Sequence, residues 1–112
     1  MPRNPTRRYV TDAEFAISLV KPGRPWTFNK GTKGYRRPKF RFPLESGLHP
    51  TQKSVGLMAE LIKIHTNAGN VILDAFMGSG TTGVAAKGLG RSFIGIEQDA
   101  KMFEVAKNRI NA

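Results

Sequence analysis

The stretch LDAFMGSGTTG, residues 73–83, decides the fold of this chain. An apolar run ends there on a single acid, Asp74, and three glycines follow as Gly78, Gly80 and Gly83 in the pattern G-x-G-x-x-G. Glycines let a ligand come close to the backbone, and the start of a helix offers unpaired N–H groups. The stretch therefore predicts a strand, a nucleotide-binding turn and a helix, in that order.

The residues on either side of this turn complete a repeating unit. VILD at 71–74 predicts a short buried parallel strand, and TTGVAAKGLG at 81–90 predicts a helix. RSFIGIE at 91–97 predicts a second apolar strand that ends on an acid, and Asp99 then stands where a helix N-cap belongs. Apolar residues follow at helical spacing up to Ile110. We expect a βαβα unit of the α/β class, with parallel strands and a right-handed crossover.

The two acids at the strand ends indicate which nucleotide such a turn would hold. Glu97 stands where a carboxylate accepts both ribose hydroxyls, which suits a nicotinamide dinucleotide and S-adenosylmethionine alike. Asp74, just before the glycines, would repel a pyrophosphate but attract the sulfonium and ammonium of S-adenosylmethionine. The sequence therefore favours S-adenosylmethionine. The alternative is that Asp74 only caps the following turn.

Charge divides the chain into two parts. The net charge is +10, and residues 1–53 hold 12 of the 18 basic side chains but only 3 of the 8 acids. Seven of the ten aromatic residues lie in the same part. We therefore expect a basic, aromatic-rich segment at 1–48 that faces a polyanion, followed by a nearly neutral half-domain at 49–112.

Composition also excludes several classes of protein. The chain has no cysteine, so disulfides and thiolate metal sites are excluded, and a cytoplasmic setting is expected. We expect no metal site. Its apolar runs fall well short of the ~20 residues that a membrane crossing needs, so no membrane partner is expected.

The region before the glycine turn is less regular. HPTQKSVGLMAELIKIHTNAGN at 49–70 predicts a helix, with Thr51 as its cap and His65 at the edge of the core. EFAISLV at 14–20 alternates as a strand does, although its start also has the spacing of a helix capping box. We favour the strand, because Lys-Pro-Gly ends it after seven residues. A loop of some twenty-five residues follows from Pro22 to Gly47.

Three segments together resemble a known family. HPTQKS at 49–54, DAFMGSGTTGVAA at 74–86 and GIEQDAKMFEVAKNRI at 95–110 resemble, in this order, the C-terminal half of the DNA amino-methyltransferases. These enzymes transfer a methyl group from S-adenosylmethionine to adenine N6 or cytosine N4. The resemblance implies part of a Rossmann-like methyltransferase fold, S-adenosylmethionine as cofactor and double-stranded DNA as partner.

The resemblance also implies roles for individual residues. Backbone at the turn would wrap the cofactor, the two threonines would supply hydroxyls, Glu97 would bind the ribose, and residues 93–96 would wall the adenine. Lys53 would pair with the cofactor carboxylate, unless it is only a solvated lysine at the helix start. The implied cofactor-binding residues are Thr51, Gln52, Lys53, Asp74, Phe76, Gly78, Ser79, Gly80, Thr81, Thr82 and Glu97.

The basic loop is the candidate DNA-facing segment. KGTKGYRRPKFRF places cations around aromatic rings, which suits phosphates and exposed bases. Phe40 and Phe42 could equally pack on another part of the fold, and the cations could be only solvated. The candidate DNA-binding residues are Lys30, Lys33, Arg36, Arg37, Lys39 and Arg41.

The catalytic tetrapeptide of that family, of the Asp-Pro-Pro-Tyr type, does not occur in the sequence. It binds the target amino group and stacks on the flipped base, so we assign no catalytic residue to this chain. We expect a missing N-terminal half or complementary polypeptide, an unpaired sheet edge with half of a hydrophobic face exposed, and possible homo-oligomers. The alternatives are a non-catalytic relic or regulatory module that binds DNA or cofactor and, less favoured, a nicotinamide dinucleotide-binding domain.

Overall fold

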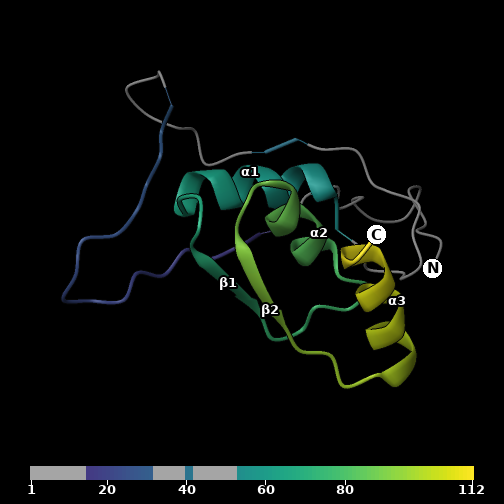
Figure 1. Ribbon diagram of the computed structural model, residues 1–112. Coiled ribbons are helices and arrows are strands. Elements are labelled where there is room, and N and C mark those ends of the chain that lie inside the picture. Colours follow the sequence, from purple (N-terminus) through teal and green to yellow (C-terminus); the bar gives the residue numbers. More distant parts are fainter. Residues whose placement is uncertain (1–14, 32–39, 42–52) are drawn as a thin grey trace, which may run out of the picture.

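The structure, a computed structural model, describes residues 15–31, 40–41 and 53–112 (Figure 1). Its elements are α1 (Val55–His65), β1 (Val71–Asp74), α2 (Thr81–Gly88), β2 (Ser92–Gly95) and α3 (Ala100–Ile110). β1 and β2 pair in parallel, with Val71 opposite Ser92 and Asp74 opposite Gly95. The βαβα order and the parallel pairing predicted from the sequence are therefore confirmed.

The helix starts show one correct and one wrong expectation. Asp99 caps α3 as predicted, since its Oδ1 accepts a hydrogen bond from the Met102 N–H at 3.0 Å. The cap of α1 is Ser54 and not Thr51, because Ser54 Oγ accepts from the Leu57 N–H at 3.2 Å. The helix thus begins at Val55, later than a cap at Thr51 implied, and Thr51 itself lies outside the described residues.

The core lies between the helices and one face of the sheet. Ile62 of α1 is buried against Ala85 and Ala86 of α2, and Ile72 and Phe93 of the strands pack against this cluster. The small alanine side chains let the two helices approach each other closely. α3 packs against α2. Within the described ranges, no helix has the length and apolar character needed to cross a membrane.

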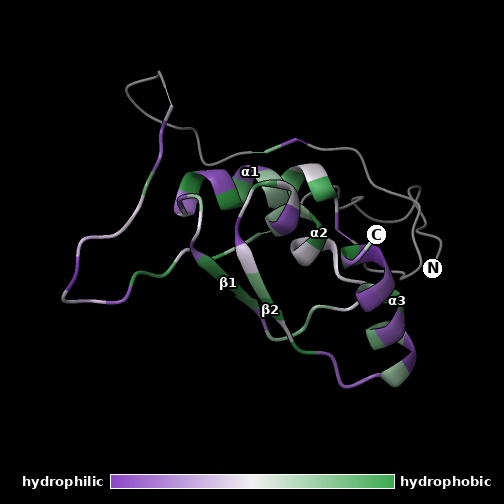
Figure 2. Ribbon diagram, viewed as in Figure 1, coloured by the Kyte–Doolittle hydropathy of each residue, from purple (hydrophilic) through white to green (hydrophobic). Residues whose placement is uncertain are grey.

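The other face of the sheet is open. Val71 and Leu73 of β1 are 61% and 63% exposed, and Ile94 and Ile96 are 55% and 54% exposed. Leu73 lies opposite Ile94 in the register, so these apolar side chains share one face. The hydrophobic colour of β1 and β2 is visible in Figure 2. The prediction of buried strands was therefore wrong, since no other layer in the described part covers this face. The expected exposure of half a hydrophobic face is confirmed.

The predicted strand at 14–20 is also wrong for its described residues. Residues 15–20 have no regular secondary structure and pair with no strand among the described residues. Phe15, Ile17 and Leu19 are 96%, 85% and 88% exposed. Alternating apolar residues favour an extended backbone, but only a neighbouring strand can satisfy its hydrogen bonds.

A short part of the N-terminal segment is nevertheless fixed to the helical layer. The Asn29 N–H donates to the Ile64 carbonyl at 2.7 Å, and its Nδ2 donates to the Lys63 and Thr66 carbonyls at 2.9 and 3.0 Å. Phe28 meets the ring of His65 edge-on, with centroids 5.7 Å apart. Asn29 thus satisfies carbonyls at the end of α1 that the helix itself leaves free. Phe28 and Asn29 are thereby attached to the end of α1.

Candidate functional site

The two acids predicted to act together lie at the same edge of the sheet. β1 ends on Asp74, and the backbone ladder continues beyond the strands: the Ile96 N–H donates to the Asp74 carbonyl at 2.9 Å. The Met77 N–H then donates to the Ile96 carbonyl at 3.0 Å. These bonds hold the glycine turn after β1 beside the segment that carries Glu97. Carboxyl ends of parallel strands are where α/β sheets bind ligands.

Glu97 joins the glycine turn to the start of α3. Its Oε1 accepts from the Gly78 N–H and its Oε2 accepts from the Asp99 N–H, each at 2.9 Å. A carboxylate has about four acceptor positions, so each oxygen can still accept one more hydrogen bond. Glu97 is therefore held in a fixed orientation by backbone and retains acceptors suited to a pair of hydroxyls.

Asp74 caps the glycine turn, as the alternative interpretation of this residue predicted. Its Oδ1 accepts from the Phe76 N–H at 3.0 Å, and its Oδ2 accepts from the Thr82 hydroxyl at 2.7 Å. Within the described part of the chain both partners are neutral, so no cation balances the negative charge. The capping role and a preference for a positively charged ligand are therefore compatible.

The first two glycines of the turn differ in what surrounds them. Gly78 has a positive φ of 53° and nothing lies within 4 Å of where a Cβ would be, so it faces open space. Gly80 has a φ of 87°, and a Cβ there would come within 2.9 Å of the Ala106 Cβ. Phe76, in the same turn, is 91% exposed. Open space, a bare backbone and a free aromatic ring thus meet beside Glu97.

Some predicted site residues are turned away from this space. Ser79 and Thr81 are buried, with exposed fractions of 3% and 6%, and their hydroxyls interact with Arg109. Phe93 packs against the helical core, whereas Ile94 and Ile96 lie on the open face. The roles predicted for these residues stay predictions, and the side chains of Ser79, Thr81 and Phe93 are engaged elsewhere.

The remaining predicted residues lie at the margin of the structure. Lys53 is exposed just before α1, and Lys30 and Arg41 are exposed in the N-terminal part. Among the described residues, no cluster of His, Cys, Asp and Glu side chains could hold a metal ion. The other predicted residues fall outside the described residues; these are Thr51, Gln52, Lys33, Arg36, Arg37 and Lys39.

Sequence reasoning missed Arg109, near the end of α3. Its Nη1 donates to the Ser79 carbonyl at 2.8 Å, 30 positions earlier in the chain. In the sequence it has the appearance of a basic residue in the last turn of a helix, where cations are common. Only the packing of α3 against α2 brings it to the glycine turn, so no local pattern could have identified it.

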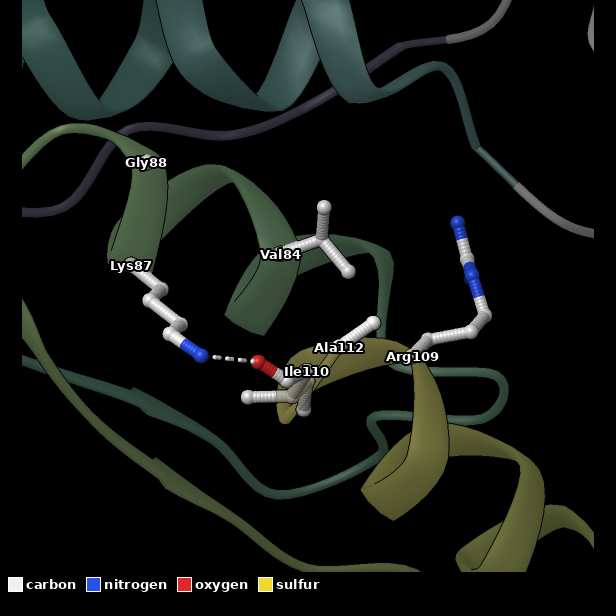
Figure 3. A pocket seen from close by; sticks show the side chains of 6 residues that line it. All are labelled: Val84, Lys87, Gly88, Arg109, Ile110 and Ala112. Atoms are coloured by element: carbon white, nitrogen blue, oxygen red, sulfur yellow. Dashed lines mark hydrogen bonds between the residues drawn. The ribbon is translucent and has the colours of Figure 1, made fainter.

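A hollow of about 320 Å³ lies elsewhere, between α2 and the end of α3 (Figure 3). The Lys87 Nζ donates to the Ile110 carbonyl at 2.8 Å across it. Neither Asp74 nor Glu97 lines it, so it is separate from the edge where the two acids meet. Its lining residues are Val84, Lys87, Gly88, Arg109, Ile110 and Ala112.

Comparison with known proteins identifies the family. Residues 1–108 match the model of a protein family, the N6/N4 methyltransferases, whose description is DNA methylase. The chain belongs to this DNA methylase family. The chain is also similar to the crystal structure of the M1.HpyAVI–SAM complex, with a TM-score of 0.90 and 50% identity. That alignment covers 100% of this chain and 57% of the other, and it confirms a partial methyltransferase fold.

Two curated relatives agree with this assignment. The chain is 49% identical over 67 residues to the Type II methyltransferase M2.DpnII of Streptococcus pneumoniae, covering 60% of this chain and 25% of that protein. It is 48% identical over 66 residues to the Type II methyltransferase M2.LlaDCHI of Lactococcus lactis subsp. cremoris, covering 59% and 24%. The matched segments thus span about a quarter of these curated relatives.

Proposed function

We propose that this chain is the cofactor-binding half of an S-adenosylmethionine-dependent DNA methyltransferase that acts on adenine N6 or cytosine N4. The observation that carries the proposal is Glu97, which holds the Gly78 amide and keeps free acceptors at the edge of the sheet. M1.HpyAVI, half of whose aligned residues are identical to those of this chain, was crystallised with SAM. The absence of cysteine suits a reducing compartment such as the cytoplasm.

The residues at this edge fit the chemical groups of S-adenosylmethionine. Glu97 would accept the two ribose hydroxyls, and the exposed Phe76 ring and the open space at Gly78 leave room for the adenosine. Asp74 would face the positively charged methionine end. Residues 51–53 would bind the carboxylate, with Lys53 as its charged partner. The backbone of residues 78–82 and the Thr82 hydroxyl would complete the site. Residues 49–112, which carry this site, would form the cofactor-binding half-domain.

When bound, S-adenosylmethionine supplies an electrophilic methyl group for direct transfer to a base nitrogen. This chain would hold and orient that donor, because positioning contributes a large part of such chemistry. It lacks the Asp-Pro-Pro-Tyr type of segment that would hold the flipped base. The complete reaction therefore needs that segment, supplied by a preceding region or by a complementary polypeptide.

Calorimetry with two ligands tests the cofactor assignment. We expect the chain to bind S-adenosylhomocysteine, while NAD gives no measurable heat, because Asp74 repels a pyrophosphate. Binding of NAD in preference to S-adenosylhomocysteine would overturn the proposal and favour the nicotinamide alternative. Binding of neither ligand would also count against it.

The basic segment at 1–48 is proposed to contact double-stranded DNA through phosphates. Of the six candidate DNA-binding residues, Lys30 and Arg41 are exposed, and the other four lie outside the described residues. The alternative, a non-catalytic module that binds DNA or cofactor, rests on the same segment and on the missing tetrapeptide. DNA binding alone therefore does not distinguish the two, whereas methyl transfer does.

We expect DNA affinity to fall steeply with salt and to drop on neutralising the loop. Replacing Arg36, Arg37, Lys39 and Arg41 with glutamine should reduce the slope of log K against log salt by about 3 to 4, measured by fluorescence anisotropy. The matched control replaces four exposed lysines of the other half, Lys63, Lys87, Lys101 and Lys107, and should leave the slope nearly unchanged. Salt-insensitive binding, or equal effects of both sets, would contradict the phosphate role.

A further inference from the structure

Arg109 makes a focused contact with the glycine turn. Its Nη1 donates to the Ser79 carbonyl at 2.8 Å and to the Ser79 hydroxyl at 3.0 Å, with the Thr81 hydroxyl at 3.3 Å. Ser79 and Thr81 are almost completely buried. A guanidinium that reaches two buried residues of one turn restrains that turn, because an ionised donor makes a strong hydrogen bond.

The ordinary explanation for a basic residue at this place does not account for the contact. Arg109 lies in the last turn of α3, where a cation stabilises the helix dipole. Its Nη1, however, donates to the turn that precedes α2, whose N-terminal end is the positive end of a dipole. In Figure 3 its side chain lies on the opposite side of Val84 and Ile110 from Lys87. The side chain is therefore directed to the turn and not to the end of its own helix.

Asp74 and the Met77–Ile96 hydrogen bond restrain the beginning of the turn, but its end at the start of α2 has no side-chain cap. Among the described helices, α1 and α3 begin on side-chain caps, Ser54 and Asp99, whereas α2 begins after Gly80 with no side-chain cap. Gly80 has a left-handed backbone, which an unrestrained glycine exchanges readily for other conformations. Contacts from outside must therefore keep the turn in shape.

Residues 78–80 are held by contacts from three residues that lie later in the chain. Glu97 accepts from the Gly78 N–H, Ala106 packs beneath Gly80, and Arg109 binds the Ser79 carbonyl between them. Two of the three come from α3, where Ala106 and Arg109 lie three residues apart. α3 thus holds the backbone that faces the open space at Gly78.

We propose that Arg109 is a positioning residue that fixes residues 78–82 in the shape that binds the cofactor. The inference rests on the proposed function for its ligand, but the restraint itself can be measured without one. Arg109 does not touch the cofactor in this proposal. It acts by removing alternative conformations of the turn, which raises affinity through preorganisation.

The test compares Arg109→Met and Arg109→Lys with Arg91→Met. Arg91 is a matched control, because its guanidinium is part-buried and donates to the Thr66 hydroxyl and carbonyl and to the Leu89 carbonyl. It precedes β2 and so lies at the amino ends of the strands, away from the turn. Both methionine variants lose a hydrogen-bonded guanidinium, but only one loses it at the glycine turn.

Hydrogen exchange without ligand gives the first measurement. The Gly80 and Val84 amides donate to the Met77 and Gly80 carbonyls at 2.8 and 3.0 Å, so their exchange reports opening of the turn. We expect Arg109→Met to speed exchange of these two amides about tenfold more than that of the Ile62 and Ala86 amides. Arg91→Met should change all four by a similar factor.

Calorimetry with S-adenosylhomocysteine gives the second measurement. We expect about a tenfold loss of affinity for Arg109→Met, about threefold for Arg109→Lys, which keeps a charged donor but not the planar guanidinium, and no loss for Arg91→Met. Equal effects of Arg109→Met and Arg91→Met on both measurements would overturn the proposal and leave Arg109 with a role in stability alone.

The design separates this proposal from the cofactor assignment. If the unmodified chain binds no S-adenosylhomocysteine, the proposed function fails, while hydrogen exchange still decides whether Arg109 holds the turn. If Arg109→Met does not fold, Arg109→Lys decides in its place. Unchanged turn exchange and unchanged affinity in that variant would refute the positioning role.

Discussion

Glu97→Ala should lower the affinity for S-adenosylhomocysteine by at least about 100-fold. Hydrogen bonds to a charged group contribute ~1.5–3 kcal/mol each, and the carboxylate would accept two from the ribose. The substitution also releases the Gly78 and Asp99 amides that the carboxylate holds now. Titration calorimetry measures the loss directly. Glu104→Ala, the same change at an exposed position of α3, should bind as the unmodified chain does.

Two outcomes would contradict this role of Glu97. One is an affinity within about threefold of the unmodified chain for a folded Glu97→Ala. The other is an equal loss in Glu104→Ala, which would show a general effect of charge. Glu97→Gln adds a finer comparison, since it keeps one acceptor oxygen but places an amide donor against a backbone N–H. Its affinity should fall between those of the alanine variant and the unmodified chain.

The same assay separates the two interpretations of Asp74. Asp74→Ala should weaken binding strongly because it removes both the turn cap and the charge. Asp74→Asn keeps an acceptor for the Phe76 amide and removes the charge, while its amide nitrogen can donate to the Thr82 hydroxyl in place of accepting from it. If Asp74 attracts the sulfonium, asparagine should weaken S-adenosylmethionine about tenfold more than S-adenosylhomocysteine, whose sulfur is neutral. Equal, unchanged affinities for both ligands would leave Asp74 as a turn cap alone.

Local patterns were sufficient to predict the C-terminal half of the fold. The apolar runs, the glycine turn and Asp99 each act within a few residues of their own position, so the order of β1, α2, β2 and α3 followed from them. The pairing of Glu97 with the glycine turn also followed, because carboxyl ends of parallel strands meet at one edge. The start of α1 was displaced because Thr51 and Ser54 are both good caps.

Features that depend on distant parts of the chain were not predictable. Arg109, Arg91 and Asn29 each bind backbone carbonyls brought near them only by folding, some of them 25 to 37 positions away. The apolar strand patterns correctly marked residues suited to burial, but burial also needs a covering layer. Residues 15–20 likewise have the alternation of a strand without a strand to pair with in the described part. In both cases the sequence indicates apolar residues suited to burial, but the described residues supply neither the covering layer nor the pairing strand.

We infer that the open sheet face is completed by the part of the methyltransferase fold that carries the catalytic tetrapeptide. Leu73 and Ile94 are paired in register on this face and more than half exposed. The chain covers 57% of the M1.HpyAVI chain, which leaves 43% of that protein to supply the remaining layers. Burying apolar surface at about 25 cal/mol per Å² would drive such an association.

Methyl transfer to DNA should therefore be undetectable with this chain alone and restored by co-expression with a polypeptide that carries an Asp-Pro-Pro-Tyr type of segment. Tritiated methyl incorporation into DNA measures both. Leu73→Lys and Ile94→Lys should abolish the restored activity, because a buried unpaired charge prevents association. Asn108→Lys adds the same charge on α3, away from this face. Co-expression should restore the activity of this control variant fully.

The outcome also decides between the enzyme and its alternatives. If co-expression restores methyl transfer in Leu73→Lys and Ile94→Lys, the partner polypeptide binds elsewhere. If the isolated chain methylates DNA, no partner polypeptide is needed. If the chain instead forms homo-oligomers that Leu73→Lys disperses, the face is covered by a second copy. Because a second copy brings no tetrapeptide, such an assembly should bind S-adenosylhomocysteine and DNA without methylating it, as the non-catalytic alternative requires.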